Sequence, residues 1–381
     1  MKSLSCLGLL GLALVGSVAN ADIRQIALPV NDLVYSRADG KIYASVPSRA
    51  GGRGNSIARI DPDKGVVETT RFVGSEPNKL ALSDDGRTLY VGLDGAAAIA
   101  RINLRTMIPD LQFPLAERGS LTPLFVLDME VQPGRPEVIA VSRRGDCCRE
   151  HVGVAVYENG VKRPTQTTQF DICAYLEFSA DSALLYAYDA FGGDYSFCRL
   201  GIDSTGVHVV DRVVLSPGTP IGAALLDMKF DSGLLYTSVG VVIDPTTRTR
   251  IARVADAGVV LPDSRSGRLF VLETNKAPLK INAYDIQTLS RVGSLSLPGL
   301  PVPLLGPPDE AGGLIRWGPD GLAFRSYGVV VLIRSDLVPA SRANRARPMT
   351  RIVRPASFHA VGSAVQTGVV SASRKDHGLV H

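Results

Sequence analysis

The residues best suited to chemistry gather in RRGDCCREH, residues 143–151. Cys147 and Cys148 are adjacent there, and His151 follows them. Such residues could bind zinc, carry a redox reaction or anchor a loop through disulfides. His151 is also a candidate general base, although a single histidine does not make a catalytic constellation. The other histidine of the folded region, His208, lies in the strand-like stretch GVHVV, where we expect a structural role. No Gly-x-Ser-x-Gly motif of a serine hydrolase is present.

Cysteine count favours disulfides over a metal or redox site. Cys147, Cys148, Cys173 and Cys198 remain after the N-terminal leader described below, and an even number in an exported chain is typical of two disulfides. Adjacent cysteines rarely bond to each other because the short ring strains the peptide. We therefore expect Cys147 and Cys148 each to pair with Cys173 or Cys198, with both arrangements open.

Carboxylates form the second group of candidate catalytic residues. The stretches FVLDMEV (125–131) and LLDMKFD (225–231) share an Asp-Met pair, which places Asp128 and Asp227 at equivalent positions, with Glu130 two residues after Asp128. Together with Glu177, these carboxylates could act as acids and bases, or bind a divalent cation such as calcium. The alternative is a repeated capping or turn role for the aspartates. We predict no cofactor, while a divalent metal stays open.

Residues 1–21 have the features of a signal peptide. Lys2 precedes the apolar run CLGLLGLALVGSV, and Ala19-Asn20-Ala21 fits the small-x-small cleavage pattern. We expect cleavage before Asp22 and export to the periplasm or the extracellular space, with an uncleaved anchor as the alternative. No later segment is long and apolar enough to span a bilayer.

The formal charge of +4 does not describe the folded region. Residues 339–381 carry seven Arg and Lys against one Asp, and Lys2 lies in the leader, so residues 22–338 have a net charge of −3. This balance argues against nucleic acid as a partner, because binding to phosphates needs clustered Lys and Arg. Residues 339–381 lack hydrophobic periodicity, and we expect a disordered basic tail.

Internal repeats predict an all-β fold, the β-propeller. NDLVYSRADGKIYASV (31–46) and PNKLALSDDGRTLYVGL (77–93) share a strand, a tight polar turn and a second strand with an aromatic residue near its start. A further pair of strands follows each copy, with turns such as DPDKG and ENG. Four strands per unit at a spacing of roughly 30 to 55 residues are typical of propeller blades. A two-sheet sandwich or two separate domains are the alternatives.

Seven such units can be delimited, with six or eight blades left open. They span residues 31–73, 77–115, 124–168, 174–214, 225–254, 258–298 and 312–338. The last unit lacks an evident fourth strand, and DIRQIALPV (22–30) has strand character. We expect this N-terminal strand to pair with the last blade and close the ring, which would leave no open edge.

The stretch PNKLALSDDGRTLYVGLDGAAAIARINLRT resembles the YVTN-type repeat of secreted seven-bladed propellers. Leu89, Tyr90 and Val91 match the repeat, whereas Gly92 and Leu93 replace its Thr-Asn pair. The other units match more loosely. The resemblance implies a secreted or periplasmic propeller of the surface-layer or lactonase-like kind. Lactonase-like propellers often hold a metal with carboxylates in the central channel, but the repeat itself transfers no catalytic residue. Quinone-dependent propellers bring many tryptophans, and this chain has one, Trp317.

The long loops of the predicted propeller should open on one face. These are the loops between second and third strands and the linkers between blades, including residues 45–56, 143–151 and 298–313. Binding sites usually lie on loops held by a rigid scaffold. We therefore predict a monomeric binding scaffold with no chemical step, whose partner is an unidentified ligand or an envelope or extracellular protein. The alternative is a lactonase-like hydrolase or lyase that uses channel-mouth carboxylates, with or without a divalent metal.

Overall fold

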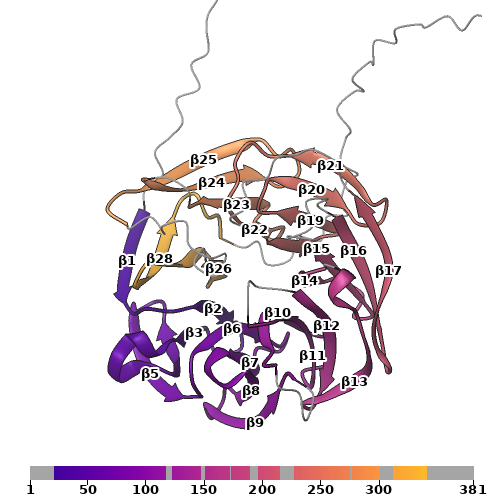
Figure 1. The fold of residues 1–381 in the computed structure, drawn as a ribbon. Helices are drawn as coiled ribbons and strands as arrows, with labels where there is room; N and C mark the ends of the chain where they lie inside the picture. The colour runs from indigo at the N-terminus through magenta and orange to yellow at the C-terminus, as the bar shows by residue number, and fades with distance from the viewer. Residues whose placement is uncertain are drawn as a thin grey trace, which may run out of the picture. The chain divides into compact units, whose positions relative to one another are not determined.

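A computed structural model describes residues 21–340 except 117–121, 147–150, 172, 189–195, 215–226, 275–276 and 301–311. The predicted signal peptide, apart from Ala21, and nearly all of the predicted basic tail therefore lie outside the described residues. Within them, β-sheets follow one another around a central axis, which confirms the predicted β-propeller (Figure 1). No helix among the described residues is long and apolar enough to cross a membrane.

In the described part of the chain, the strands form five separate four-stranded sheets and one eight-stranded sheet. The eight-stranded sheet consists of two four-stranded halves joined by one parallel bridge, between Thr165 and Gly206, so the ring has seven four-stranded blades. The first four blades are β2 (Asp32–Ser36) to β5 (Val66–Phe72), β6 (Pro77–Leu82) to β9 (Ile108–Pro114), β10 (Phe125–Val131) to β13 (Val161–Gln166), and β14 (Tyr175–Phe178) to β17 (Gly206–Val214). The last three are β18 (Met228–Asp231) to β21 (Thr249–Arg253), β22 (Val259–Asp263) to β25 (Arg291–Leu297), and β26 (Gly312–Trp317) to β28 (Val329–Ser335) with β1 (Ala21–Ala27).

The N-terminal strand β1 completes the last blade, as predicted. It pairs antiparallel with β28 in a continuous register from Ala21 opposite Ser335 to Ala27 opposite Val329. The outermost strand of this blade therefore comes from the start of the chain, whereas its other three strands come from the end. The pairing of β1 with β28 therefore joins the start and the end of the chain in one blade and closes the ring.

Among the residues with a described position, seven hydrophobic clusters hold neighbouring blades together, one at each interface between blades. The aromatic residue of the repeated second strand is buried in these clusters, as Tyr43, Tyr90, Phe270 and Phe324 show at 0% exposure. The conserved design of the repeats within this chain is thus explained by packing, because each unit buries its apolar surface only against a neighbour.

The tight turns between first and second strands also connect the blades. Ser36 donates a hydrogen bond from its hydroxyl to the carbonyl oxygen of Gly86 in the next blade, at 2.8 Å. Gly86 has a φ of +67°, and a Cβ there would lie only 2.9 Å from the Ser36 hydroxyl. Glycine is required at this turn both for its backbone conformation and for the close approach.

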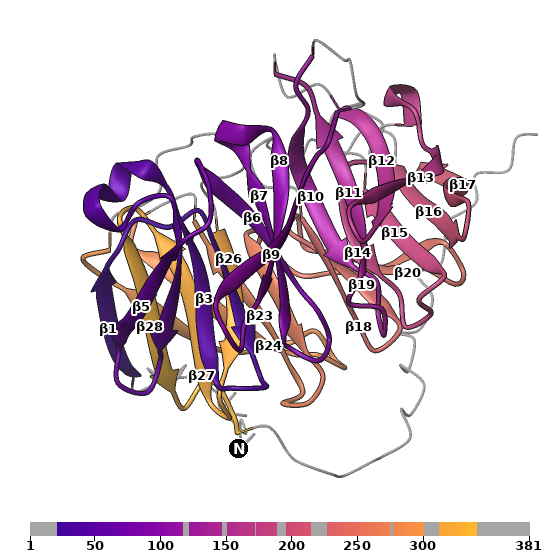
Figure 2. The same cartoon turned by 90° about the horizontal axis from the view of Figure 1, so that it is seen from below.

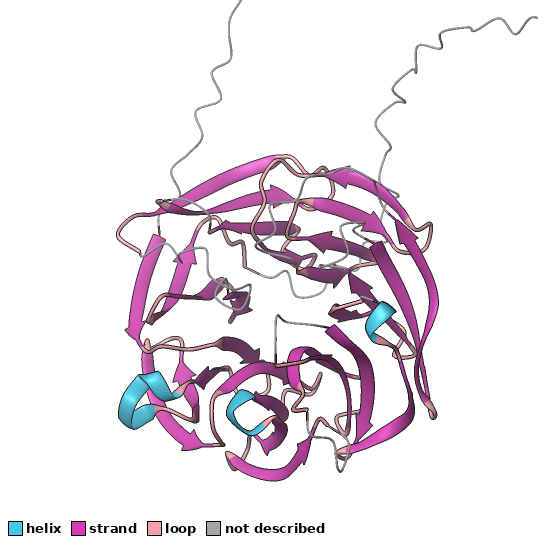
Figure 3. Cartoon of the chain, in the orientation of Figure 1, coloured by secondary structure: helices cyan, strands magenta, loops and turns pink. Residues whose placement is uncertain are grey.

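Three 3-10 helices in the described residues mark the opposite face, η1 (Ser48–Arg53), η2 (Asp94–Ala96) and η3 (Gln169–Asp171). Two lie between second and third strands, and η3 lies in a linker between blades. They are coloured cyan in Figure 3 and lie on the same side of the ring in Figure 2. We call this side the loop-bearing face and the side with the turns between first and second strands the turn face.

Candidate functional site

A cavity of about 610 Å³ occupies the central channel. Its walls include residues from the innermost strand of every blade, β2, β6, β10, β14, β18, β22 and β26. Each of these strands begins toward the loop-bearing face and ends at a turn on the turn face, so one end of the cavity, called the mouth below, is on the side of the loop-bearing face. This position makes the cavity the candidate functional site, since ligand sites in propellers and barrels lie in such concave openings.

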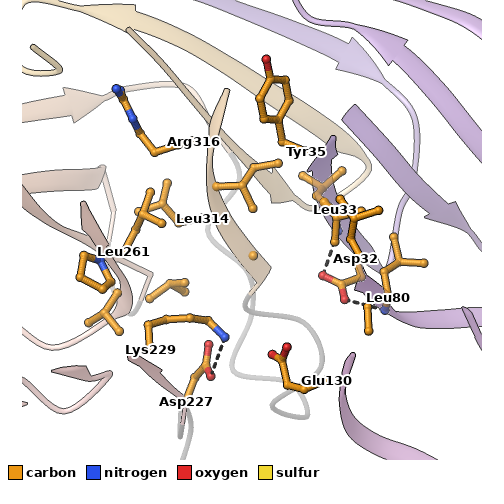
Figure 4. A pocket seen from close by; sticks show the side chains of 18 of the residues that line it. Asp32, Leu33, Tyr35, Leu80, Glu130, Asp227, Lys229, Leu261, Leu314 and Arg316 are labelled. Carbon is orange, nitrogen blue, oxygen red and sulfur yellow. Dashed lines mark hydrogen bonds and ion pairs between the residues drawn. The ribbon is translucent and has the colours of Figure 1, made fainter. Parts of the chain in front are cut away.

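Lys229 stands at the centre of the charged part of the cavity. Its ammonium nitrogen lies 3.2 Å from a carboxylate oxygen of Glu177 and 3.5 Å from one of Asp227. Glu130 points into the same space from β10 (Figure 4). Its carboxyl makes no hydrogen bond or ion pair with another residue in the described part of the chain. A charged cluster with one uncommitted member can receive a polar ligand.

The repeated design explains why these charges meet. Glu130, Glu177 and Lys229 lie on the inner strands β10, β14 and β18, each two residues after one of the corresponding positions Asp128, Tyr175 and Asp227. Side chains two residues apart along a strand share a face, so all three occupy the same level of the channel in three consecutive blades.

The opposite wall carries apolar residues at the same level of the inner strands. These positions are Val34, Ala81, Leu261 and Ile315, all of which line the cavity. At this one level of the inner strands, the charged side chains therefore come from one side of the channel. At this level a ligand would meet charged groups on one side and an apolar wall on the other.

Burial and mutual repulsion change the acidity of the cluster. Burial raises the pKa of Glu177 to about 6, with Asp227 adding to the effect and Lys229 opposing it. Burial and the neighbouring Glu177 hold the pKa of Glu130 well above its ordinary value. Burial alone would lower the pKa of Lys229, but the carboxylates led by Asp227 and Glu177 outweigh it and hold this pKa well above the usual value. The site therefore holds a charged ammonium group beside two glutamates that bind protons more tightly than ordinary glutamates do.

Asp128 connects two blades, as the capping interpretation proposed. Its carboxylate accepts a hydrogen bond from the backbone N–H of Met129 at 3.0 Å and another from Leu176 in the next blade at 2.8 Å. Asp32 makes the same two kinds of bond in the first blade, to Leu33 at 2.8 Å and to Leu80 at 3.0 Å. Burial raises the pKa of Asp128 to about 6, while Lys79 and Lys229 oppose the shift.

Asp227 caps its own inner strand and is also part of the charged cluster around Lys229. Its carboxylate accepts a hydrogen bond from the backbone N–H of Met228 at 2.8 Å, as Asp128 does from Met129, and it also pairs with Lys229. Among the four carboxylates that the sequence singled out, Asp227, Glu130 and Glu177 therefore lie around the ammonium group, and Asp128 lies at their edge as a structural tie. Of the described residues, no group of three or more His, Cys, Asp or Glu is placed to hold a metal ion.

The histidines lie away from the cavity. His151 begins β12 (His151–Glu158), the third strand of its blade, and is 5% exposed. Burial, and then the positive charge of Arg143, lower its pKa to about 4. His208 lies on the outermost strand β17, where its ring is half-exposed and 3.9 Å from Asp203. Neither lines the channel cavity, so neither is placed to act on a ligand there.

The predicted disulfide pairing is wrong in one respect. Cys173 and Cys198 bond to each other, with their Cα atoms 6.1 Å apart. Both are fully buried, since the linker that enters the fourth blade places Cys173 against the third strand of that same blade. The sequence argument paired each with the third-blade loop because it considered strain between adjacent cysteines and not contacts within one blade. Cys147 and Cys148 lie outside the described residues.

Sequence reasoning missed the residue at the centre of the site. Lys229 lies two residues after Asp227 in the stretch LLDMKFD that drew attention to the aspartate. Its position matched that of Glu130 in the related stretch FVLDMEV, which was the available signal. A lysine facing two glutamates at one level of the repeat indicates an ion-pair cluster only when the blades are known to be adjacent.

Comparison with known proteins supports the fold but does not point to any activity. No protein-family model matches the sequence, and the search of curated proteins found no match either. In structure, the chain is similar to a solved chain described as Kuenenia stuttgartiensis hydrazine synthase, with a TM-score of 0.57 and 14% identity. The likeness covers 87% of this chain and 100% of the other. Since 1236 solved chains match in structure, the likeness identifies a widespread architecture.

Proposed function

We propose that this chain is an exported β-propeller that binds a small polar ligand in the mouth of its central channel, without a chemical step. The observation that carries the proposal is the cavity of about 610 Å³ that is lined by Lys229, Glu130 and Asp227, with Glu177 behind it as an ion-pair partner of Lys229. Cavities of this size, with a few convergent polar groups on a rigid frame, are typical of small-molecule sites.

Export rests on two features of the chain. Residues 1–21 have the pattern of a signal peptide, and Cys173 and Cys198 form a disulfide. Structural disulfides persist in oxidising compartments and are rare in the cytosol. Both features support a periplasmic or extracellular protein.

The ligand class follows from the groups that face the cavity. Glu130 offers a carboxyl group with no partner in the described residues, Lys229 offers N–H donors, and Leu261 and Ile315 lie on the apolar side. A ligand with hydroxyl or amino groups on one side and a less polar face on the other would satisfy both walls. The charged side would fix its orientation through charge-assisted hydrogen bonds.

The test measures binding by the full exported chain and by a mouth variant, Glu130→Gln/Lys229→Met. The probes are spermidine, glucose and gluconolactone, added over a concentration series while the melting temperature is recorded. We expect a saturable rise with at least one probe, lost in the mouth variant and retained in Asp110→Asn/Lys64→Met. The latter side chains are 46% and 71% exposed outside the channel, and the variant changes the same charges. No saturable rise with any probe would count against the proposal.

One observation favours a second candidate, the lactonase-like hydrolase. Glu177 has a pKa of about 6 and lies 3.2 Å from a permanent ammonium group, which pairs a proton acceptor with a group able to stabilise an oxyanion. Saturable hydrolysis of a lactone panel that is abolished by Glu177→Gln would replace binding with catalysis. Saturable binding without turnover would support the proposed binding scaffold over the hydrolase.

A further inference from the structure

The turn-face end of the channel carries a separate group of charges. Arg37 follows the inner strand β2, Arg265 lies in the turn after β22, and Arg316 lies near the end of β26. All three line the same cavity as the mouth cluster. Arg37 directly follows β2 and lies five residues beyond Asp32 at the start of that strand, so Asp32 and Arg37 are about 16 Å apart at 3.3 Å per residue.

The three guanidinium groups come from three consecutive blades and are electrostatic neighbours. Burial, and then the positive charge of Arg265, lower the pKa of Arg37. Burial also lowers the pKa of Arg316, and Arg37 contributes to that shift. Like charges held near each other in a partly desolvated space repel, so the arrangement is unfavourable unless an anion compensates it.

The carboxylates of the described residues at this end compensate only part of the charge. Asp263 pairs with the Nε of Arg316 at 2.9 Å and accepts a hydrogen bond from the Ser266 hydroxyl at 2.7 Å. Asp231 accepts hydrogen bonds from the backbone N–H and the hydroxyl of Ser264, at 2.6 and 2.7 Å. Both carboxylates are therefore occupied by other donors.

Arg316 is largely committed to the protein as well. Besides Asp263, its guanidinium donates to the carbonyl oxygens of Pro319 at 2.7 Å and Gly321 at 3.4 Å. Arg37 and Arg265 make no hydrogen bond or ion pair with any other described residue. The protein therefore holds Arg316 in place. The guanidinium groups of Arg37 and Arg265 beside it are available to a ligand.

We propose that the turn-face end of the channel is an anion site that binds a compact oxyanion with two or more negative charges. Arg37 and Arg265 would hold this anion beside Arg316. Two uncommitted guanidinium groups can each donate paired hydrogen bonds to carboxylate or phosphate oxygens, and such charge-assisted pairs are the strong ones. Phosphate and polycarboxylates share this chemistry. The inference does not rest on the proposed function, because the mouth cluster and this site share no residue.

The experiment titrates inorganic phosphate, citrate and succinate into the full chain by isothermal titration calorimetry at low ionic strength. We expect saturable binding of at least one of these anions. In Arg37→Gln/Arg265→Gln its Kd should rise at least tenfold, since two charge-assisted contacts are lost. Binding should also weaken as salt is added. Phosphate binding without citrate or succinate would assign a phosphate ligand, and the reverse a polycarboxylate; both outcomes support the site.

The matched control is Arg71→Gln/Arg105→Gln, which removes two exposed arginines outside the channel and changes the net charge by the same amount. Its Kd should equal that of the unaltered chain. Circular dichroism and thermal melts of both variants would show that each is folded. Three results would overturn the site: no saturable binding of any of the three anions, an unchanged Kd in the folded channel variant, or an equal loss in the control.

Discussion

The ammonium nitrogen of Lys229 lies 3.2 Å from a carboxylate oxygen of Glu177, although 52 residues separate the two in the sequence. The pair joins the inner strands of two neighbouring blades across the wall of the channel. Glu177 is 17% exposed and Lys229 35% exposed, so both side chains are partly shielded from bulk water. The pair therefore contributes both to the charge of the cavity and to the contact between the fourth and fifth blades.

A double-mutant cycle should detect this coupling. We expect Lys229→Met and Glu177→Gln each to destabilise the fold, and the double variant to lose less than the sum, with a coupling of about 1–3 kcal/mol in urea unfolding. Each single change leaves a partly buried charge without its partner. The pair of Arg24 and Asp22, whose side chains are 47% and 55% exposed, is the control and should couple by less than about 1 kcal/mol. Equal coupling in both pairs would contradict the shielding of the channel.

The pH dependence of the free energy of unfolding should reflect the raised pKa of Glu177. Its pKa rises from 4.5 to about 6 on folding, so the folded state binds this proton more tightly than the unfolded chain. Its carboxyl favours folding below about pH 4.5, and this contribution is lost as the pH rises through about 6. The stability of Glu177→Gln relative to the unaltered chain should therefore improve by up to about 2 kcal/mol between pH 4 and 7, measured by urea unfolding.

Glu68 supplies a control with the opposite sign. The hydrogen bond from Lys41 lowers its pKa, so its carboxylate favours the folded state above the unfolded pKa and loses that contribution as the pH falls. The relative stability of Glu68→Gln should decline as the pH rises from 4 to 7. If the relative stability of both variants changed in the same direction between pH 4 and 7, folding would not raise the pKa of Glu177.

The disulfide between Cys173 and Cys198 should hold the fourth blade together. Replacing both cysteines by alanine should lower the free energy of unfolding by about 3 kcal/mol, because the crosslink closes a loop of moderate length in the unfolded chain. Peptide mapping of the unreduced protein by mass spectrometry should recover the two cysteines in one linked fragment. A fragment that links either of them to Cys147 or Cys148 would restore the pairing predicted from the sequence.

Ring closure by β1 can be tested within that strand. Ile26 is 8% exposed and packs into the cluster between the last and first blades, whereas Ile23 is 37% exposed. Ile26→Ala should cost about 2–3 kcal/mol of stability through lost burial and a cavity, and Ile23→Ala less than about 1 kcal/mol. Similar losses in thermal or urea unfolding at the two positions would argue against β1 packing in this register.

The sequence by itself determined the blades. Each turn, strand alternation and buried aromatic residue is specified by neighbours within one unit, as Gly86 in its turn and Tyr90 in the strand after it illustrate. Such local signals repeat along the chain, so the propeller and its closing strand could be predicted from periodicity. The candidate carboxylates Glu130 and Asp227 could likewise be placed on an inner strand or at its start.

Only the tertiary structure decided which of these side chains meet. Lys229, Glu177 and Glu130 come from three separate repeats, and their proximity depends on the angle and order at which blades pack around the axis. The same holds for Arg37, Arg265 and Arg316 at the other end of the channel. The pairing of Cys173 with Cys198 likewise depended on the path of a linker back onto its own blade. Local sequence encodes the strands, whereas the environment of each charge arises from contacts among distant segments, which no single repeat contains.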